Sequence, residues 1–94
     1  MTVEVDYTLY LEGTTFMLKE NKDMFEGYQV IPNKYDSDSV ILKKTKKSSR
    51  TYNNLGSFIA SFENDIKQEE CEDYFLHNAD VYIDKIHINF NLND

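Results

Sequence analysis

Two runs of like charge are the features of this sequence whose spacing could bind a charged partner. The first, the basic run, holds five of the ten basic residues within eight positions: Lys43, Lys44, Lys46, Lys47 and Arg50. The second, the acidic run, places six carboxylates within eleven positions: Glu63, Asp65, Glu69, Glu70, Glu72 and Asp73. Clustered carboxylates repeat the charge spacing of a phosphate backbone, so they can occupy a basic groove built for DNA.

The acidic run lies where a predicted helix ends. Carboxylates in the last turn of a helix oppose its macrodipole and cost roughly 0.3–1 kcal/mol each. Because these acids lower the stability of the helix, a binding role explains them better than one in folding. Tyr74, next to Asp73, would add an amphipathic contact. A solvated helix end is the alternative.

The basic run is open to three interpretations. On an alternating strand, Lys44 and Lys46 face one way, whereas Lys43 and Lys47 face the other. Lysines on a strand commonly protect a sheet edge from aggregation. The other two interpretations are contact with a nucleic acid and contact with a protein. The net charge of −7 argues against direct binding of nucleic acid.

The histidines and the single cysteine do not have the spacing of a catalytic or metal site. Cys71 is flanked by glutamates, which raise the pKa of a thiol and disfavour the nucleophilic thiolate. His77 and His87 lack the short paired spacing of zinc ligands, and the three glycines are isolated rather than grouped in a phosphate-binding loop. We therefore expect no enzymatic activity, no cofactor and no metal.

Length and composition predict one domain that spans residues 1–94. Apolar residues make up 40% of the chain and include seven tyrosines and six phenylalanines, enough for a folded core. One cysteine cannot form an intrachain disulfide, which suits the reducing cytoplasm of a host cell. The chain shows neither the pattern of a signal peptide nor the roughly 18 apolar residues that span a bilayer. We expect a cytoplasmic protein without a membrane partner.

One helix and several strands must position the two charged runs. Residues 53–70 have a helical period, and their predicted apolar stripe consists of Leu55, Phe58, Ile59, Phe62 and Ile66. We expect Ser49, Thr51 or Asn53 to cap this helix.

Most other apolar residues alternate with period two, as in strands. The predicted strands are residues 2–11, 14–19, 28–32, 40–46 and 81–92. Gly13 suggests a tight turn, so the first two would form a hairpin. The last strand changes phase at Asp84-Lys85, where a bulge or a tight turn is needed. The fold class is α+β: an antiparallel sheet of about five strands with one main helix on one face, in the order ββββαβ.

The C-terminal half resembles a known family. The resemblance rests on Phe58-Ile59-Ala60-Ser61-Phe62-Glu63-Asn64, then on Gln68-Glu69-Glu70-Cys71-Glu72-Asp73, and on an alternating last strand that ends in Leu92-Asn93. These segments are similar to the small acidic Cas9-inhibiting anti-CRISPR proteins of Listeria prophages. That family has an α+β fold and occupies the site where Cas9 reads the short DNA motif beside its target. The resemblance implies that Glu69, Glu70, Glu72 and Asp73 mimic DNA.

The sequence thus leads to the expectation of a small, non-enzymatic inhibitor from a phage or mobile element. Its partner would be a basic nucleic-acid-binding protein, specifically Cas9 with its guide RNA. The expected contact residues are Glu63, Asp65, Glu69, Glu70, Glu72, Asp73 and Tyr74. The alternative is a small interaction module, such as an immunity-type antitoxin or a domain that self-associates through a sheet edge. The chain would be a monomer or a homodimer.

Overall fold

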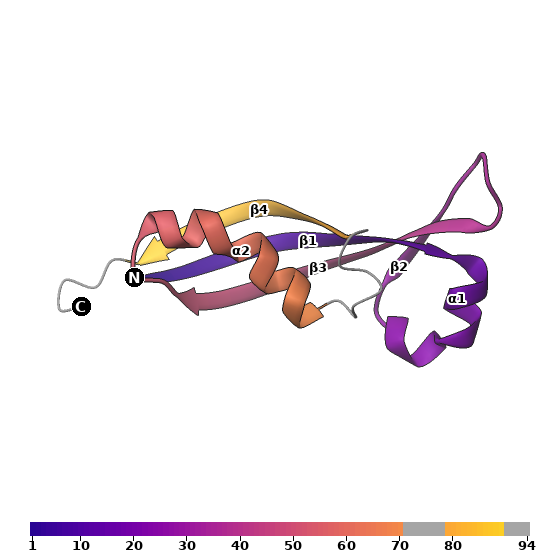
Figure 1. Ribbon diagram of the computed structural model, residues 1–94, viewed down its shortest axis with the longest axis horizontal. Coiled ribbons are helices and arrows are strands. Elements are labelled where there is room, and N and C mark those ends of the chain that lie inside the picture. Colours follow the sequence, from indigo (N-terminus) through magenta and orange to yellow (C-terminus); the bar gives the residue numbers. More distant parts are fainter. Residues whose placement is uncertain (71–78, 90–94) are drawn as a thin grey trace.

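A four-stranded antiparallel sheet forms the long axis of the protein (Figure 1). The computed structural model describes residues 1–70 and 79–89. Its strands, in the spatial order β2-β3-β1-β4, are β1 (Thr2–Thr14), β2 (Gln29–Pro32), β3 (Ser39–Thr51) and β4 (Ala79–Asn89). The helices are α1 (Thr15–Glu20), the 3-10 helix η1 (Lys22–Phe25) and α2 (Leu55–Glu70). The α+β class is as predicted.

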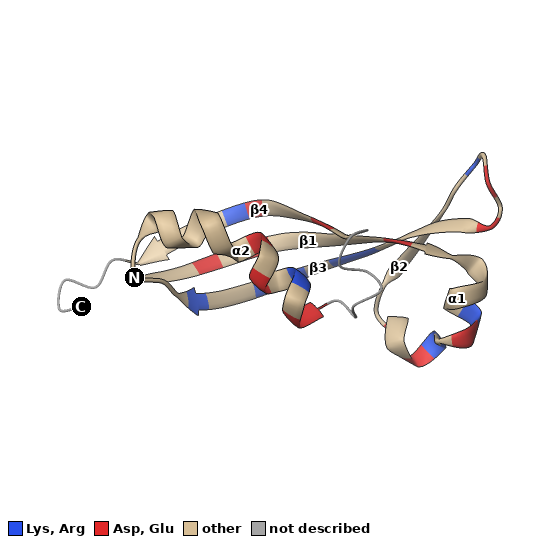
Figure 2. Cartoon of the chain, viewed as in Figure 1, with Lys and Arg blue, Asp and Glu red and all other residues tan. Residues whose placement is uncertain are grey.

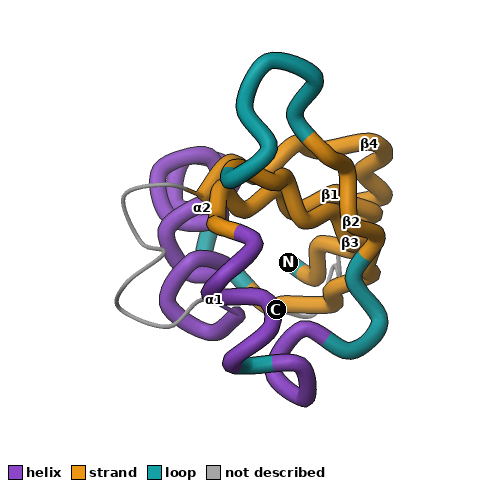
Figure 3. The backbone as a smooth tube through the Cα atoms, turned by 90° about the vertical axis from the view of Figure 1, so that its right-hand side faces the viewer, coloured by secondary structure: helices purple, strands orange, loops and turns teal. Residues whose placement is uncertain are grey.

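The central strand β1 carries much of the core. Its alternating side chains Val3, Val5, Tyr7, Leu9 and Leu11 are at most 2% exposed, and they belong to one core with the buried side chains of the helices. In the view down the long axis, the helices gather on one side of the strands (Figure 3). The other side, here called the open face, has no helix over it among the described residues.

Helix α2 covers the half of the sheet that contains the N-terminus. Phe58, Phe62 and Ile66 recur at four-residue steps and are 1–3% exposed. The ring of Phe62 meets that of Tyr7 edge to face, with centroids 5.8 Å apart. The predicted stripe was too wide, however, because Leu55 and Ile59 are 46% and 72% exposed.

Asn54 caps helix α2, so the predicted caps were wrong. Its side-chain oxygen accepts a hydrogen bond of 2.8 Å from the backbone N–H of Ser57. Its carbonyl oxygen accepts the first helical bond, from Phe58. The cap therefore lies later in the chain than predicted, because Ser49 and Thr51 still belong to strand β3.

The predicted hairpin at Gly13 was also wrong. Gly13 lies within β1 and pairs with Val40, so the strand continues to Thr14. The hydroxyl of Thr14 then accepts a bond of 3.1 Å from the N–H of Met17 and caps α1. This local cap favours a helix where residues 14–19 were predicted to form a strand. The described chain therefore has four strands instead of about five, in the order strand, helix, two strands, helix, strand.

Helix α1 and η1 cover the end of the sheet that α2 does not reach (Figure 1). Phe25 of η1 is 6% exposed and joins the same core as Leu42 of β3. Its ring also meets Tyr28 edge to face. The core is thus covered by two separate helical segments, one at each half of the sheet.

The predicted phase change in the last strand is confirmed, and of the two options for it the structure has the bulge. Tyr7 pairs with Ile83 and Asp6 pairs with Lys85, so Asp84 is an extra residue in β4. Its carboxylate accepts a hydrogen bond of 2.7 Å from the hydroxyl of Thr8. The extra residue keeps Ile83 and Ile86 on the side of the helices, although their numbers differ in parity.

Candidate functional site

The acidic end of α2 is joined to the basic run on β3. Arg50 contacts Glu69 with both ends of its guanidinium group, and its Nη1 lies 2.9 Å from Oε1. Lys46 Nζ lies 2.7 and 2.6 Å from the two carboxylate oxygens of Glu70. The two charged runs, separate in the sequence, therefore neutralise each other in part.

Two further carboxylates of the acidic run also have partners. The hydroxyl of Tyr52 lies 3.3 Å from Asp65 Oδ2 and donates to it. Glu63 pairs with Lys67 one turn later, at 3.2 Å. The side chains of Glu63 and Glu69 nevertheless stay 60% and 57% exposed, whereas Glu70 is 22% exposed. Glu63 and Glu69 are therefore the carboxylates of α2 that a partner could reach most readily.

Three predicted contact residues, Glu72, Asp73 and Tyr74, lie outside the described residues. Cys71 and His77, considered above for nucleophilic or metal chemistry, also lie in that segment. The structural account of the acidic run therefore ends at Glu70.

The Arg50–Glu69 pair shifts the pKa values of both groups. The hydrogen bond from Arg50 lowers the pKa of Glu69 below its ordinary value, and the bond from Glu69 raises the pKa of Arg50. Inside the core, burial, with a smaller contribution from Glu70, raises the pKa of Tyr7 to about 12. Glu69 and Arg50 are therefore both charged at neutral pH, and Tyr7 is neutral.

The basic run divides between the two faces of β3, as predicted. Lys46 faces α2, and Lys44 lies on the same side, 5.0 Å from the ring centroid of Tyr28. Lys43 lies on the open face, 5.8 Å from the centroid of the Tyr10 ring, and Lys47 lies on the same face, opposite Asp6. Because β2 pairs only with the segment 40–43, the rest of β3 is a sheet edge within the described chain. This placement fits the interpretation of edge protection.

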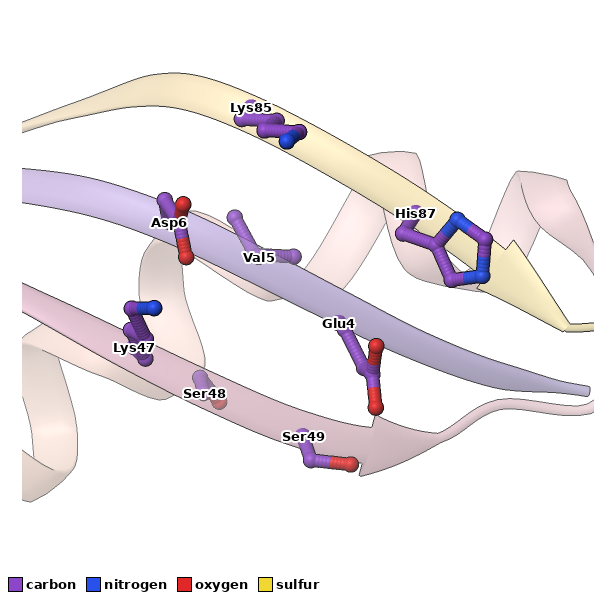
Figure 4. Close-up of a pocket in the computed structure, with 8 residues that line it drawn as sticks. All are labelled: Glu4, Val5, Asp6, Lys47, Ser48, Ser49, Lys85 and His87. Carbon is purple, nitrogen blue, oxygen red and sulfur yellow. The ribbon is translucent and has the colours of Figure 1, made fainter.

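A polar hollow of about 570 Å³ lies on the open face (Figure 4). It is formed where three strands run side by side, and its lining includes Glu4, Asp6, Lys47, Ser49, Lys85 and His87. Asp6 on the central strand pairs in register with Lys47 on one side and Lys85 on the other. Glu4 likewise lies between Ser49 and His87. Opposite charges in register on neighbouring strands favour strand pairing. The placement of Asp6 between Lys47 and Lys85 is therefore explained by the stability of the sheet.

Sequence reasoning did not identify this hollow. The alternation of residues 2–11 does put Glu4 and Asp6 on one polar face, and the neighbours Ile86 and Ile88 put His87 on the polar face of the last strand. No local pattern, however, shows that β3 and β4 are the two neighbours of β1. The strand order was the missing information.

Neither a metal-binding cluster nor a membrane helix is found in the described part of the chain. Within residues 1–70 and 79–89, no three His, Cys, Asp or Glu side chains gather closely enough to hold a metal ion. None of the described helices is long and apolar enough to cross a bilayer.

Comparison with known proteins gave no match: no family model, no curated protein and no solved structure is significantly similar to this chain.

Proposed function

We propose that this protein is a small non-enzymatic inhibitor that binds a basic nucleic-acid-binding protein. Cas9 with its guide RNA is the specific candidate, on the resemblance described above. The observation that carries the proposal is the net charge of −7, combined with exposed carboxylates on an anchored helix. An acidic surface attracts a basic partner over a distance and orients it before contact.

The contact is proposed to centre on the C-terminal half of α2. Arg50 holds Glu69 in place but leaves its side chain 57% exposed. A carboxylate that is already fixed loses little conformational freedom when a partner binds it, which favours affinity. Glu63, about 1.7 turns earlier, is the second accessible group. Asp65 and Glu70 support the surface, while Glu72, Asp73 and Tyr74 belong to the proposal on the sequence alone.

Internal pairing limits how strongly this surface can act as a mimic of DNA. Lys46 and Arg50 cancel part of the charge of Glu70 and Glu69, as the mixture of red and blue near the end of α2 illustrates (Figure 2). Carboxylates at the end of a helix oppose its dipole, and this destabilisation was the reason for expecting a binding role. The ion pairs with Lys46 and Arg50 offset that destabilisation within the fold. The proposal therefore depends on the exposed carboxylates rather than on that cost.

The test measures inhibition of target cleavage by guide-loaded Cas9 at low and high salt. We compare the double variant Glu63→Gln/Glu69→Gln with Glu20→Gln/Glu26→Gln, which removes the same charge from exposed positions near α1 and η1. We expect the first variant to weaken inhibition about tenfold and the second to change it less than about twofold, with both losses shrinking in high salt. Both single variants are measured too, because Glu69→Gln also frees Arg50 and Glu63→Gln also frees Lys67.

Two results would count against the proposal. Equal losses in the two double variants would show that net charge alone is recognised. If Cas9 is not inhibited, a pull-down from a bacterial lysate at both salt concentrations tests for another basic partner. The absence of any nucleic-acid-binding protein released by salt would then exclude the proposed class of partner.

A further inference from the structure

Strand β4 is an edge strand with an unusually apolar exposed surface. Within the described chain it pairs only with β1, so the backbone groups along its outer edge have no strand partner there. Ile83 and Ile86 are 46% and 43% exposed on the face that carries the helices. Tyr82 is 58% exposed on the open face. Long edge strands with exposed apolar residues tend to pair with another strand.

The position of α2 explains why these isoleucines are exposed. The ion pairs of Glu69 and Glu70 join the end of the helix to β3. Because β1 separates β3 from β4, these ion pairs hold the end of the helix on the far side of the central strand. The first part of α2 lies close to β4, but the helix then crosses the sheet toward β3, so Ile83 and Ile86 are left partly uncovered.

The other edges of the sheet are protected against pairing. On the opposite side, the short strand β2 ends in Pro32, which cannot donate a ladder hydrogen bond. The exposed part of β3 carries Lys44, Lys46 and Lys47. Lysines and prolines are common means of blocking an edge. On β4 the devices present are one bulge and three charged residues, Asp80, Asp84 and Lys85, of which only one is a lysine.

The bulge makes β4 complementary to itself in one antiparallel register. If Asp84 lies opposite Lys85 of a second copy, then Ile83 lies opposite Ile86 and Val81 opposite Ile88. In the same register Tyr82 lies opposite His87. The phase change at Asp84 places both members of each of these pairs on the same face of the sheet. In a strand without the extra residue, the two members of each pair would lie on opposite faces of the sheet.

We propose that β4 is a homodimer interface, in which two copies pair antiparallel about a two-fold axis between Asp84 and Lys85. Such an isologous contact joins the two sheets into one. Four isoleucines then meet at the centre of the apolar face. Asp84 of each copy lies opposite Lys85 of the other, on the open face. The carboxylate of Asp84 already accepts a hydrogen bond from Thr8, and it has the capacity to accept another from the lysine. This inference does not depend on the proposed inhibition of Cas9.

Sedimentation equilibrium of the full chain is the first test. We expect the apparent mass to rise with concentration from 11.1 kDa toward twice that value. The variant Ile83→Lys should remain a monomer, because it places two lysines among the apolar residues of the interface. Val30→Lys is the matched control, since Val30 is 42% exposed on β2, at the opposite edge of the sheet from β4, and this variant should dimerise normally. Circular dichroism shows whether both variants are folded.

Disulfide cross-linking tests the register itself. In a Cys71→Ser background, Ile83→Cys and Ile86→Cys are prepared as separate variants and then mixed. The proposed register brings position 83 of one copy beside position 86 of the other, so the mixture should cross-link readily and each variant alone should not. A chain that stays monomeric at all concentrations, a dimer that persists in Ile83→Lys, or cross-linking of one variant with itself would overturn the proposal.

Discussion

At the scale of single residues, Arg50 fixes the position of the Glu69 carboxylate at the end of α2. Its guanidinium group binds Glu69 through both terminal nitrogens, while Ser48 Oγ accepts a bond from its Nε. A bidentate contact fixes orientation as well as distance. Arg50 therefore sets the place of the carboxylate through which we propose contact with a partner. A lysine at this position would keep the charge but lose that geometry.

This pair predicts a specific loss of stability in acid. The pKa of Glu69 is lowered in the folded state by Arg50, so the stabilisation is present above the ordinary pKa of a glutamate. It is lost as pH falls through the lowered folded-state value, because protonation then breaks the pair. Urea unfolding of the protein and of Glu69→Gln, each measured at neutral and acidic pH, should converge as the pH decreases. The expected difference is small because the pair is exposed. A difference in unfolding free energy between the two proteins that stays constant across this pH range would contradict the prediction.

At the scale of elements, the bulge in β4 decides which side chains reach the core. Asp84 adds one residue to β4, and Thr8 on β1 donates a hydrogen bond to it. Without the extra residue, one half of the strand would turn its isoleucines to the open face. The bulge therefore maintains one apolar face along the whole strand.

Deletion and substitution of Asp84 should have different consequences. Asp84→Ala removes the hydrogen bond from Thr8 and should cost about 1–3 kcal/mol of unfolding free energy. Deletion of Asp84 should cost more, since it forces either Ile83 or Ile86 away from the apolar side and brings polar neighbours in its place. Chemical denaturation of both variants measures the difference. Equal costs would show that the hydrogen bond, and not the phase of the strand, is what matters here.

The elements that the sequence predicted well are those with a strong local period. The helix over residues 55–70 and the phase change at Asp84 follow from the spacing of apolar residues alone. The hairpin was mispredicted because Gly13 looks like a turn residue, whereas its role depends on pairing with Val40, which lies far away in the sequence. The link between Arg50 and Glu69 was missed for the same reason. Contacts between distant segments leave no mark in local periodicity.

At the scale of the whole molecule, the protein is elongated and its core is covered in two parts. The radius of gyration is 15.7 Å, whereas about 12 Å is expected for a compact domain of this length. The longest dimension is 53 Å, and the other two are 23 and 22 Å. Helix α2 covers one half of the sheet, and α1 with η1 covers the other (Figure 1). Strands β1 and β3 are the elements that connect the two halves.

This division predicts that the end with α1 and η1 opens at a lower free energy than the rest. Few buried side chains hold that end, chiefly Phe25 with Val40 and Leu42. Amide hydrogen exchange should therefore give lower opening free energies for β2 than for the part of β1 under α2. Phe25→Ala should lower the values for β2 by roughly 3–5 kcal/mol, or abolish protection there. Phe62→Ala should lower the values under α2 and leave those for β2 unchanged. If all amides share one opening free energy, and both variants lower it everywhere, the protein is a single cooperative unit despite its shape.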